Sequence, residues 1–575
     1  MKYQCHLFSR FSLFLAGVLA FSAAAPVLAQ TPSAANLEAQ ELLRQQERER
    51  VLRQQQEHTP DVRLPRPAEA EAVRLPADES PCFPIGRIEL QGDLAERFQW
   101  AVAAANPEDD PALGRCLGAE GINLVMKRIQ NAIVGQGFVT TRVLAQPQDL
   151  RTGTLVLTVV PGRVRAARLA EGAESRAGLW NGLPARSGDL LNLRDIEQGL
   201  ENFKRVPTAE ADIQIVPADG DTAQPGESDL QITYRQAFPF RLSLTADDAG
   251  SRATGKYQGS TTVSYDNWWT LNDLFYFTVS QSITPADPGN KGPLGYTGHY
   301  SIPYGYWLLG FTAGHNRYHQ AVAGANQTYV YSGESDNAEV KLSRLVYRDA
   351  VRKTTLWVSG WTRGSKNYID DTEVLVQRRR MAGWAAGMGH REFLGAATLD
   401  ANLNYKRGTG ADGSLKAPEE NFGEGTSRPR LVTADLQLNW PFALEGQSFR
   451  YLGVWRGQWN DTPLVPQDRF SIGGRYTVRG FDGETTLSAE RGWLVRNDLA
   501  IVLQGQELYL GADYGEVNGP SAGKLAGKYL GGAVIGLRGS VAGVGYDLFV
   551  GQPTKRPEHF KAPPNAAGFS LSMQF

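Results

Sequence analysis

The feature that most constrains this fold is an alternation of apolar and polar residues that runs through residues 238–575. In its clearest segment, AATLDANLNY, Leu399 and Leu403 alternate with Asp400 and Asn404. A period of two places apolar side chains on one face of a β-strand and polar side chains on the other. Trp and Tyr near several strand ends are typical of the girdles of membrane barrels. We therefore predict an all-β transmembrane barrel. A soluble secreted sandwich is the alternative, but it would have shorter strands and fewer terminal aromatic residues.

The length of this region limits the number of strands. Roughly 340 residues divided among 16 strands leave about 21 per strand with its connection, of which a spanning strand takes about 9 to 11. That arithmetic favours about 14 to 18 strands. After residue 29, no run approaches the roughly 18 to 20 apolar residues that a spanning helix needs, so a membrane crossing would have to use strands.

The last predicted strand carries its large apolar side chains on one face, at Phe569, Leu571, Met573 and Phe575. Outer-membrane barrels present a terminal strand of this kind, ending in an aromatic residue, to their assembly machinery. We expect these four residues to form that C-terminal barrel signal.

The first 29 residues have the pattern of a secretory signal peptide. Lys2 and Arg10 precede an apolar run, and Val27 to Ala29 form a small-residue cleavage pattern before Gln30. The mature chain then keeps Cys82 and Cys116. Two cysteines in an oxidising compartment predict one disulfide, and two unpaired buried thiols are the alternative.

The composition of residues 30–57 predicts a single polar helix. The segment from Asn36 to Glu57 is rich in helix formers with intermixed Glu and Arg, but its apolar positions are too few for a coiled-coil seam. Such a helix lies in a wet environment that it can hydrogen-bond, or it is a frayed surface helix. Residues 58–81 hold several prolines and charges and predict an extended linker.

Two consecutive α/β units follow, over residues 82–162 and 163–236. Each reads as a strand, helical segments and two further strands, which is an internal repeat of architecture. The first unit is expected to contain helices at 95–105 and 121–135 and strands at 138–145 and 153–160. The second is expected to contain strands at 163–169, 211–218 and 228–236 and a helix at 193–204, with its first helix not visible in the sequence. Both units could offer a strand edge to a partner.

Within the barrel region, the run FSIGGRYTVRGFDGE at 470–484 places Arg479 among four glycines. The segment is too rich in glycine to pack a core or a helix, so we interpret it as a long loop that carries a cation towards an acidic partner. The alternative is an arginine on an exposed extracellular loop with no fixed partner.

Taken together, these features resemble the outer-membrane transporters of two-partner secretion, of the haemolysin secretion/activation and contact-dependent inhibition type, within the barrel-assembly superfamily. The resemblance covers nearly the whole mature chain. It rests on the motifs CFPIGRIEL, GFVTTRVLAQPQDL, GTLVLTVVPGRV, YTVRGFDGE, ERGWLVRNDL and LGADYG.

The resemblance implies an architecture in which a barrel of about 16 antiparallel strands spans residues 237–575. Residues 82–162 and 163–236 would be two periplasmic polypeptide-transport-associated (POTRA) domains, here POTRA 1 and POTRA 2. The helix at 30–57 would thread the lumen as a plug, and the loop around 470–490 would fold inward. In that loop the motif residues are Val478, Arg479, Gly480 and Phe481, and Asp513 on the barrel wall would be the partner of Arg479.

The resemblance also implies a function and a location. The protein would sit in the bacterial outer membrane with its POTRA domains in the periplasm, and it would export an unfolded exoprotein through the lumen. Expected partners are a secreted adhesin, haemolysin or contact-dependent toxin, the barrel-assembly machinery and outer-membrane lipid. Strand addition beside a helix suits an unfolded chain, and the candidate docking residues are Leu124, Phe138, Thr140 and Arg142. A barrel-assembly insertase or an outer-membrane channel or receptor is the alternative.

Enzymatic and nucleic-acid functions are not indicated. The sequence contains no H-E-x-x-H, G-x-S-x-G or phosphate-loop motif, and its net charge of -2 offers no broad basic surface. His315 and His319 have a spacing that suits a metal on a helix, but their surroundings predict a strand. We expect no cofactor, no metal and no nucleic-acid partner.

Overall fold

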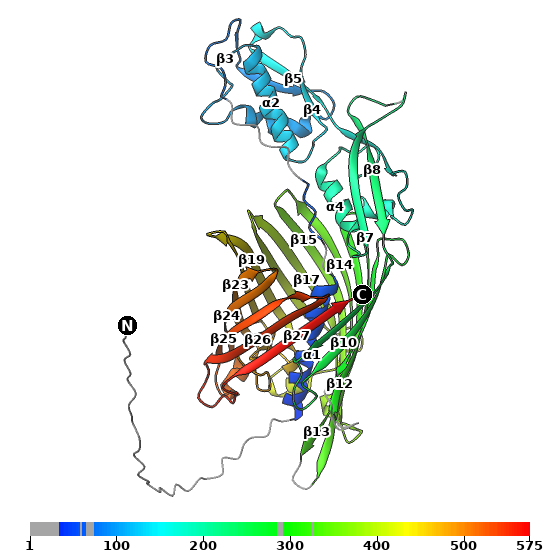
Figure 1. Ribbon diagram of the computed structural model, residues 1–575, viewed down its shortest axis with the longest axis vertical. Helices are drawn as coiled ribbons and strands as arrows, with labels where there is room; N and C mark the ends of the chain where they lie inside the picture. The colour runs from blue at the N-terminus through cyan, green and yellow to red at the C-terminus, as the bar shows by residue number, and fades with distance from the viewer. Residues whose placement is uncertain (1–33, 58–59, 65–73, 222, 284–290, 324–326) are drawn as a thin grey trace, which may run out of the picture.

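The computed structural model describes residues 34–57, 60–64, 74–221, 223–283, 291–323 and 327–575. The predicted signal peptide, residues 1–29, lies outside the described residues, as does part of the predicted linker. Figure 1 shows a barrel with one helix inside it and two small domains beyond one of its mouths.

The barrel is closed by sixteen strands among the described residues, each antiparallel to its neighbours. β27 pairs with β9 to close it, from Ser570 opposite Asp247 to Gln574 opposite Ser243. The predicted fold class is therefore confirmed. The strands are β9 (Phe240–Asp247), β10 (Gln258–Asp266), β11 (Leu274–Ser282), β12 (Lys291–Tyr304), β13 (Trp307–Ala323), β14 (Thr328–Arg348), β15 (Arg352–Ile369), β17 (Arg379–Leu394), β18 (Ala397–Thr409), β19 (Arg430–Leu444), β20 (Gln447–Asn460), β23 (Arg491–Leu503), β24 (Gln506–Asn518), β25 (Tyr529–Val541), β26 (Val544–Lys555) and β27 (Ala566–Gln574), with the short β16 (Thr372–Glu373) extending β15.

The alternation of the sequence becomes two faces of the barrel wall. On β24, Leu508 and Leu510 point outward and are 42% and 62% exposed, whereas Tyr509 and Asp513 point into the lumen and are buried. An outer face of aliphatic and aromatic side chains suits lipid, and the polar inner face suits water and polar partners. Among the residues that the structure describes, no helix has the length and apolarity of a membrane-spanning helix.

POTRA 1 packs two helical segments on a three-stranded sheet of order β2-β5-β4. Phe98, Ile129, Ile133, Leu155 and Leu157 are fully buried between these layers. Its elements are β1 (Phe83–Pro84), β2 (Arg87–Gln91), the 3-10 helix η1 (Ala95–Ala105), β3 (Cys116–Leu117), α2 (Ala119–Gly135), β4 (Arg142–Ala145), η2 (Leu150–Thr152) and β5 (Thr154–Val160). Cys82 and Cys116 are joined by a disulfide beside the β1–β3 pair.

The strand predicted from residue 138 begins only at Arg142. Gly137, with φ of +101°, turns the chain after α2, and Phe138 then enters the core, where its ring meets Phe98 edge-on at 5.3 Å. Thr141 is fully buried, and its hydroxyl accepts a hydrogen bond from Gly162 N at 3.0 Å. The β-branched composition of 138–141 thus serves a buried turn, not a strand.

POTRA 2 forms a second three-stranded sheet, of order β6-β8-β7, beside the barrel mouth (Figure 1). Its elements are β6 (Arg163–Leu169), α3 (Leu179–Gly182), α4 (Leu193–Phe203), β7 (Ala209–Pro217) and β8 (Glu227–Gln236). Asn181 Nδ2 donates to Pro303 O at 3.0 Å, Asn202 Nδ2 donates to Gly305 O at 2.8 Å, and Arg205 Nη2 donates to Ser301 Oγ at 2.5 Å. These buried bonds fix POTRA 2 on the end of β12 and on the turn that follows it.

The described part of the linker at Pro60–Leu64 is held against POTRA 2 and the barrel rim. The backbone N–H groups of Val62 and Leu64 each donate at 2.9 Å, to Glu201 and Glu197 of α4 respectively. Arg348, at the end of β14, binds both carboxylates and also donates to Val62 O at 2.6 Å. The predicted extended segment therefore makes specific contacts where it leaves the barrel.

One linker residue stabilises POTRA 1, which leads to a prediction. The Glu79 carboxylate accepts from the N–H groups of Gly118, Glu120 and Gly121 at 2.8, 2.9 and 3.0 Å, which caps the start of α2. Glu79→Ala is expected to destabilise POTRA 1 by about 1 kcal/mol, measured by protease resistance of the domain in the full chain. Glu89→Ala removes only a surface pair with Arg87 and should change little.

The same cap predicts a pH dependence. Burial raises the pKa of the Glu79 carboxyl, but the backbone N–H groups of Gly118, Gly121 and Glu120 lower it further, so its pKa is below the ordinary value of 4.5. Its contribution is therefore fully present above pH 4.5 and is lost as the pH falls through the lowered pKa. The stability difference between wild type and Glu79→Ala should shrink below that pH, and an unchanged difference would contradict the cap.

Candidate functional site

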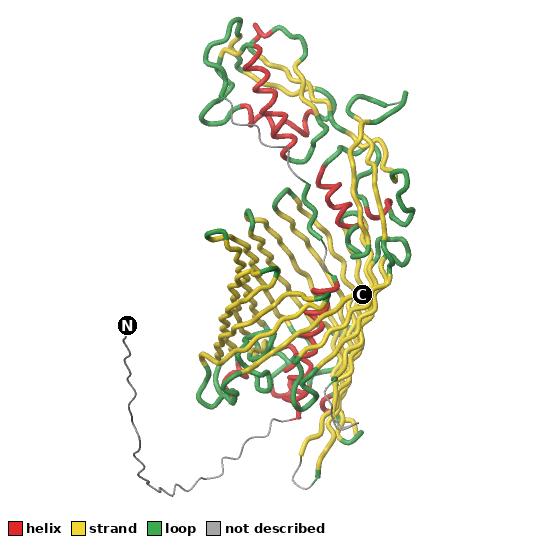
Figure 2. Tube along the Cα trace, in the orientation of Figure 1, coloured by secondary structure: helices red, strands yellow, loops and turns green. Residues whose placement is uncertain are grey.

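The lumen of the barrel is occupied by the helix α1 (Ala34–Gln56). Figure 2 shows this helix enclosed by the strands of the barrel, with its C-terminal end towards the POTRA domains. Arg48 Nη1 donates to Gln258 on β10 at 2.5 Å, and Arg53 Nη1 donates to Glu339 on β14 at 3.1 Å. On the opposite side, Glu47 accepts two hydrogen bonds from Arg456 on β20, at 2.7 and 3.1 Å. The helix is thus bound to several separate parts of the wall.

These contacts are almost all polar, as the composition of the helix requires. Glu49 accepts from Asn316 at 2.9 Å and from Asn337 at 3.2 Å, and Glu57, just beyond the helix, accepts from Tyr276 at 2.9 Å. Ion pairs and hydrogen bonds in a wet lumen can be exchanged for contacts with water at a modest net cost. A helix held in this way is able to leave without exposing a large apolar surface.

The second lumenal element is the connection between β20 and β23, which folds into the barrel. It contains the 3-10 helix η5 (Pro466–Asp468) and a small hairpin of β21 (Phe470–Ile472) and β22 (Leu487–Ala489). Val478 and Phe481 are buried in an apolar cluster between the hairpin and the wall. Within that cluster Phe481 also meets Phe560 edge-on at 5.7 Å.

Between these two anchors, Arg479 forms a forked ion pair with the wall. Its Nε and Nη2 donate to the two oxygens of Asp513 at 2.7 Å each, and its backbone N–H donates to the same carboxylate at 2.9 Å. Nη2 also donates to Asp498 on β23 at 2.5 Å. A planar guanidinium matches a carboxylate in this geometry, which lysine cannot reproduce.

Asp498 was not predicted from the sequence. It lies in the ERGWLVRNDL motif, at a lumen-facing position of β23, and its second oxygen accepts from Arg538 at 3.1 Å. Arg538 in turn donates to Glu507 at 2.6 Å, and Arg450 donates to the same carboxylate at 2.7 Å. The alternation of apolar and polar residues along β23 indicates that Asp498 faces the lumen. Its proximity to Arg479 depends on the register of β23 against β24, which the sequence pattern does not specify.

Glycines allow the loop backbone to touch the wall. Gly480 has φ of +93°, and a Cβ at that position would lie 2.5 Å from Gln552 O. A Cβ on Gly532 of β25 would lie 1.8 Å from Arg479 O. Real Cβ atoms do not approach backbone oxygens so closely, so both positions require glycine for this docking.

Gly532→Ala is therefore expected to detach the loop while leaving the strand intact. Residues 470–490 of the purified barrel should become several-fold more sensitive to protease. The control is Gly523→Ala, because a Cβ there meets nothing within 4 Å. Wild-type protease resistance of Gly532→Ala would show that the loop does not depend on this close docking.

The helix and the loop also contact each other. Arg44 Nη2 of α1 donates to Gly483 O of the loop at 2.7 Å. Arg475 of the loop pairs with Asp248 and donates to Phe569 O of β27 at 2.5 Å. The loop therefore contacts α1, β24 and the closing strand pair, so that a movement of one of these elements changes the contacts of the others.

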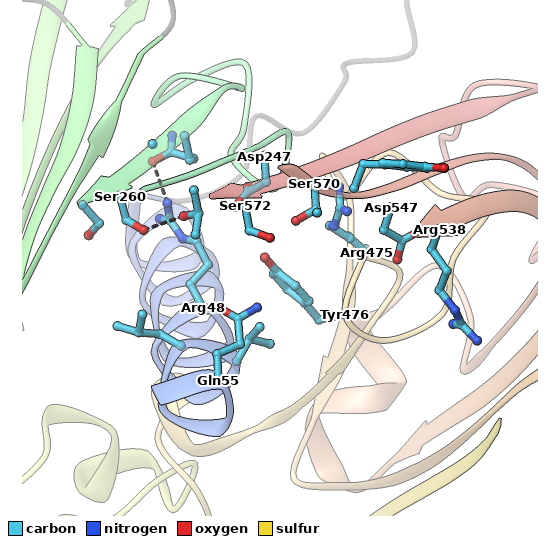
Figure 3. Close-up of a pocket in the computed structure, with 18 of the residues that line it drawn as sticks. Arg48, Gln55, Asp247, Ser260, Arg475, Tyr476, Arg538, Asp547, Ser570 and Ser572 are labelled. Carbon is cyan, nitrogen blue, oxygen red and sulfur yellow. Dashed lines mark hydrogen bonds between the residues drawn. The ribbon is translucent and has the colours of Figure 1, made fainter. Parts of the chain in front are cut away.

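A cavity of about 590 Å³ remains between α1 and the wall. Figure 3 shows Arg48 and Gln55 of the helix facing it from one side, with Tyr476, Asp547, Ser570 and Ser572 across from them. The lining is largely polar and charged, so the lumen beside α1 is suited to water.

The predicted docking residues do not share one surface. Leu124 and Phe138 pack against the core of POTRA 1, and the hydroxyl of Thr140 is buried. Arg142 is exposed at the start of β4, the edge strand of the sheet. On that strand the outward side chain of Leu144 is 47% exposed, and sequence reasoning did not single it out.

The other sequence candidates are placed as follows. Phe569, Leu571 and Met573 lie on the outer face of β27, since the alternate Ser570 and Ser572 line the lumen. Phe575 exchanges two backbone hydrogen bonds with Leu242 of β9, at 2.9 and 3.2 Å.

His315 and His319 lie on β13, not on a helix, and His315 contacts Asp336 at 2.7 Å. No group of three or more potential metal ligands occurs within the described ranges.

A sixteen-stranded barrel with a helix in its lumen and two POTRA domains at one mouth defines an outer-membrane protein transporter. Residues 226–539 match the family described as haemolysin secretion/activation protein ShlB/FhaC/HecB, residues 163–217 match a POTRA domain, and residues 83–162 match a POTRA domain of the ShlB type. The chain belongs to this family of two-partner secretion transporters.

Individual relatives agree with this assignment. The chain is 36% identical over 551 residues to the outer membrane transporter CdiB-2 of Burkholderia pseudomallei, covering 92% of this chain and 93% of that protein. It is 23% identical over 426 residues to the hemolysin transporter protein HpmB of Proteus mirabilis, covering 73% and 72% of the two chains. The solved structure of CdiB from Acinetobacter baumannii superposes with a TM-score of 0.80 at 30% identity, covering 95% of this chain and 100% of that one.

Proposed function

We propose that this transporter recognises an unfolded exoprotein in the periplasm through its two POTRA domains and exports it through the barrel lumen to the cell surface. The observation that carries this proposal is the lumenal helix α1, which hydrogen bonds and ion pairs of Glu47, Glu49 and Arg53 hold against the barrel wall. A helix with side chains is about 10 to 12 Å across, so α1 and a translocating chain do not share the lumen. Docking of the exoprotein displaces α1 into the periplasm.

The edge strand β4 of POTRA 1 is the proposed first docking point. Its partner β5 covers one side only, so the other side offers backbone groups to an extended chain. Arg142 and Leu144 lie at this edge, whereas Leu124 and Phe138 pack against the core of the domain. Strand addition uses backbone hydrogen bonds and therefore requires little sequence specificity, which suits an unfolded cargo.

The proposed cargo is a large secreted protein of the toxin, haemolysin or adhesin class. The names of the relatives as a hemolysin transporter and as CdiB transporters support this class. We further propose that the barrel-assembly machinery recognises the apolar outer face of β27, which carries Phe569, Leu571, Met573 and Phe575. The same outer face then contacts outer-membrane lipid.

Site-specific photo-crosslinking tests the route. Photoreactive residues are placed at Leu144 on β4 and at Thr278 on the lumenal face of β11, in cells that make an exoprotein stalled by a folded C-terminal fusion. Adducts to the exoprotein are expected at both positions. A matched position at Trp269, in a barrel turn, should give none. Adducts at Leu144 without any at Thr278 would place the export route outside the lumen.

A further inference from the structure

The periplasmic end of the barrel carries a band of aromatic side chains on its outer face, over β9 to β12. Trp268 stacks on Trp269 and meets Tyr265 and Phe275 at 5.4 and 5.2 Å between ring centroids. Tyr304, at the end of β12, is 53% exposed and follows the outward positions of that strand. Such girdles mark the boundary between the hydrocarbon core and the headgroups of a bilayer.

POTRA 2 continues this band with Trp180. The indole of Trp180, on α3, is 57% exposed, and its centroid lies 6.0 Å from the ring of Tyr304. The neighbouring Asn181 is fully buried, and its side chain donates to Leu271 O at 2.5 Å, in the turn between β10 and β11, and to Pro303 O at 3.0 Å, at the end of β12. The height of Trp180 relative to the membrane is therefore set by the barrel itself.

An arginine accompanies this tryptophan. Arg186 is exposed, its Nη2 donates to Trp180 O at 2.6 Å, and its guanidinium lies 5.9 Å from the ring of Tyr304. One strand pair further, Arg344 lies 4.9 Å from the ring of Trp307 at the same end of the barrel. Cationic side chains beside interfacial aromatic rings can bind the phosphates of phospholipid headgroups.

We propose that the face of POTRA 2 formed by Trp180 and Arg186 lies in the headgroup layer of the periplasmic leaflet. Its occupant is the phospholipid surface, because the face is continuous with the lipid-facing girdle at Tyr304 and because its charge complements phosphate. Leaflet contact adds a second restraint to the hydrogen bonds of Asn181, so POTRA 2 keeps its orientation while POTRA 1 presents β4. The alternative is that Trp180 and Arg186 bind the exoprotein and not the phospholipid surface.

Depth-dependent quenching tests this contact in the full chain. The cysteines are the disulfide pair Cys82 and Cys116 and Cys5 in the predicted signal peptide, so Trp180→Cys adds a single free thiol to the mature chain. This thiol is labelled with an environment-sensitive fluorophore, and the protein is placed in phosphatidylethanolamine and phosphatidylglycerol vesicles that carry a nitroxide near the headgroup. Leu144→Cys, a similarly exposed apolar position on POTRA 1, is the matched control.

We expect the nitroxide to quench the label at 180 several-fold more than the label at 144, and aqueous iodide to show the reverse order. Arg186→Cys should be quenched like Trp180→Cys, and it carries the test if the first variant fails to assemble. Equal quenching of all labels would overturn the proposal. It would also be overturned if the label at 180 stayed accessible to iodide and became shielded only when exoprotein was added.

Discussion

Replacing Arg479 with alanine is expected to abolish export of the exoprotein while the barrel still inserts into the outer membrane. The substitution leaves Asp513 and Asp498 facing each other in the lumen without their shared cation. Removing one partner of a buried ion pair costs about 3 to 5 kcal/mol, and water in the lumen places this case at the low end. Exoprotein in the medium, compared with heat-modifiable barrel in the outer membrane, measures the effect.

Two further variants separate the geometry of Arg479 from its charge. Arg479→Lys keeps the cation but not the forked hydrogen bonds, so export should be reduced and not lost. Arg252→Ala removes an exposed arginine beside Glu484 of the same loop and should export normally. Exchanging the residues, as Arg479→Asp with Asp513→Arg, should restore only part of the activity, since Asp498 would then face a carboxylate. If Arg479→Ala fails to insert, the motif acts in assembly and not in export.

Deleting residues 34–56 is expected to raise the conductance of the barrel in planar bilayers at least several-fold. The deletion removes a rod about 10 to 12 Å across from the lumen, and the polar wall positions at Asn316, Glu339 and Arg456 then face water. Single-channel recordings of the purified protein measure the change. The inward loop still fills part of the lumen, so the conductance should stay below that of an empty barrel.

A charge variant provides the matched comparison for this deletion. Glu47→Gln with Glu49→Gln and Arg53→Gln keeps the helix but removes its ion pairs to Arg456 and Glu339. We expect brief transitions between the low and the high conductance, because the helix then leaves and returns. A deletion variant with wild-type conductance would show that α1 does not block the pore.

The fold could be predicted largely because its signals are periodic or local. Alternation through residues 238–575 specifies strands with two different faces, and the polar composition of 36–57 specifies a helix in a wet environment. The β-branched residues of 138–141 predict a strand, but the positive φ of Gly137 and the burial of Thr141 produce a turn instead. A helix as short as α3 leaves no periodic signal.

The site could be predicted only in part. The resemblance named Arg479 with Asp513, and the structure brings these two residues together. Asp498 and the contacts of Val62 and Leu64 with α4 depend on strand register and on residues more than 100 positions away, which local patterns do not encode. Leu124 and Phe138 are candidates for docking because strand addition beside a helix suits an unfolded chain, but both side chains pack against the core of POTRA 1.

The central claim is that α1 must leave the lumen before the exoprotein can pass. The most direct test of this claim is to cross-link α1 to the barrel wall. In the double variant Glu49→Cys and Asn316→Cys, a short bifunctional thiol reagent added to cells would join the two positions, because the native side chains are hydrogen-bonded at 2.9 Å. We predict that export stops in proportion to the fraction of transporter cross-linked, while each single-cysteine variant treated in the same way exports normally. Undiminished export through fully cross-linked transporter would contradict the account.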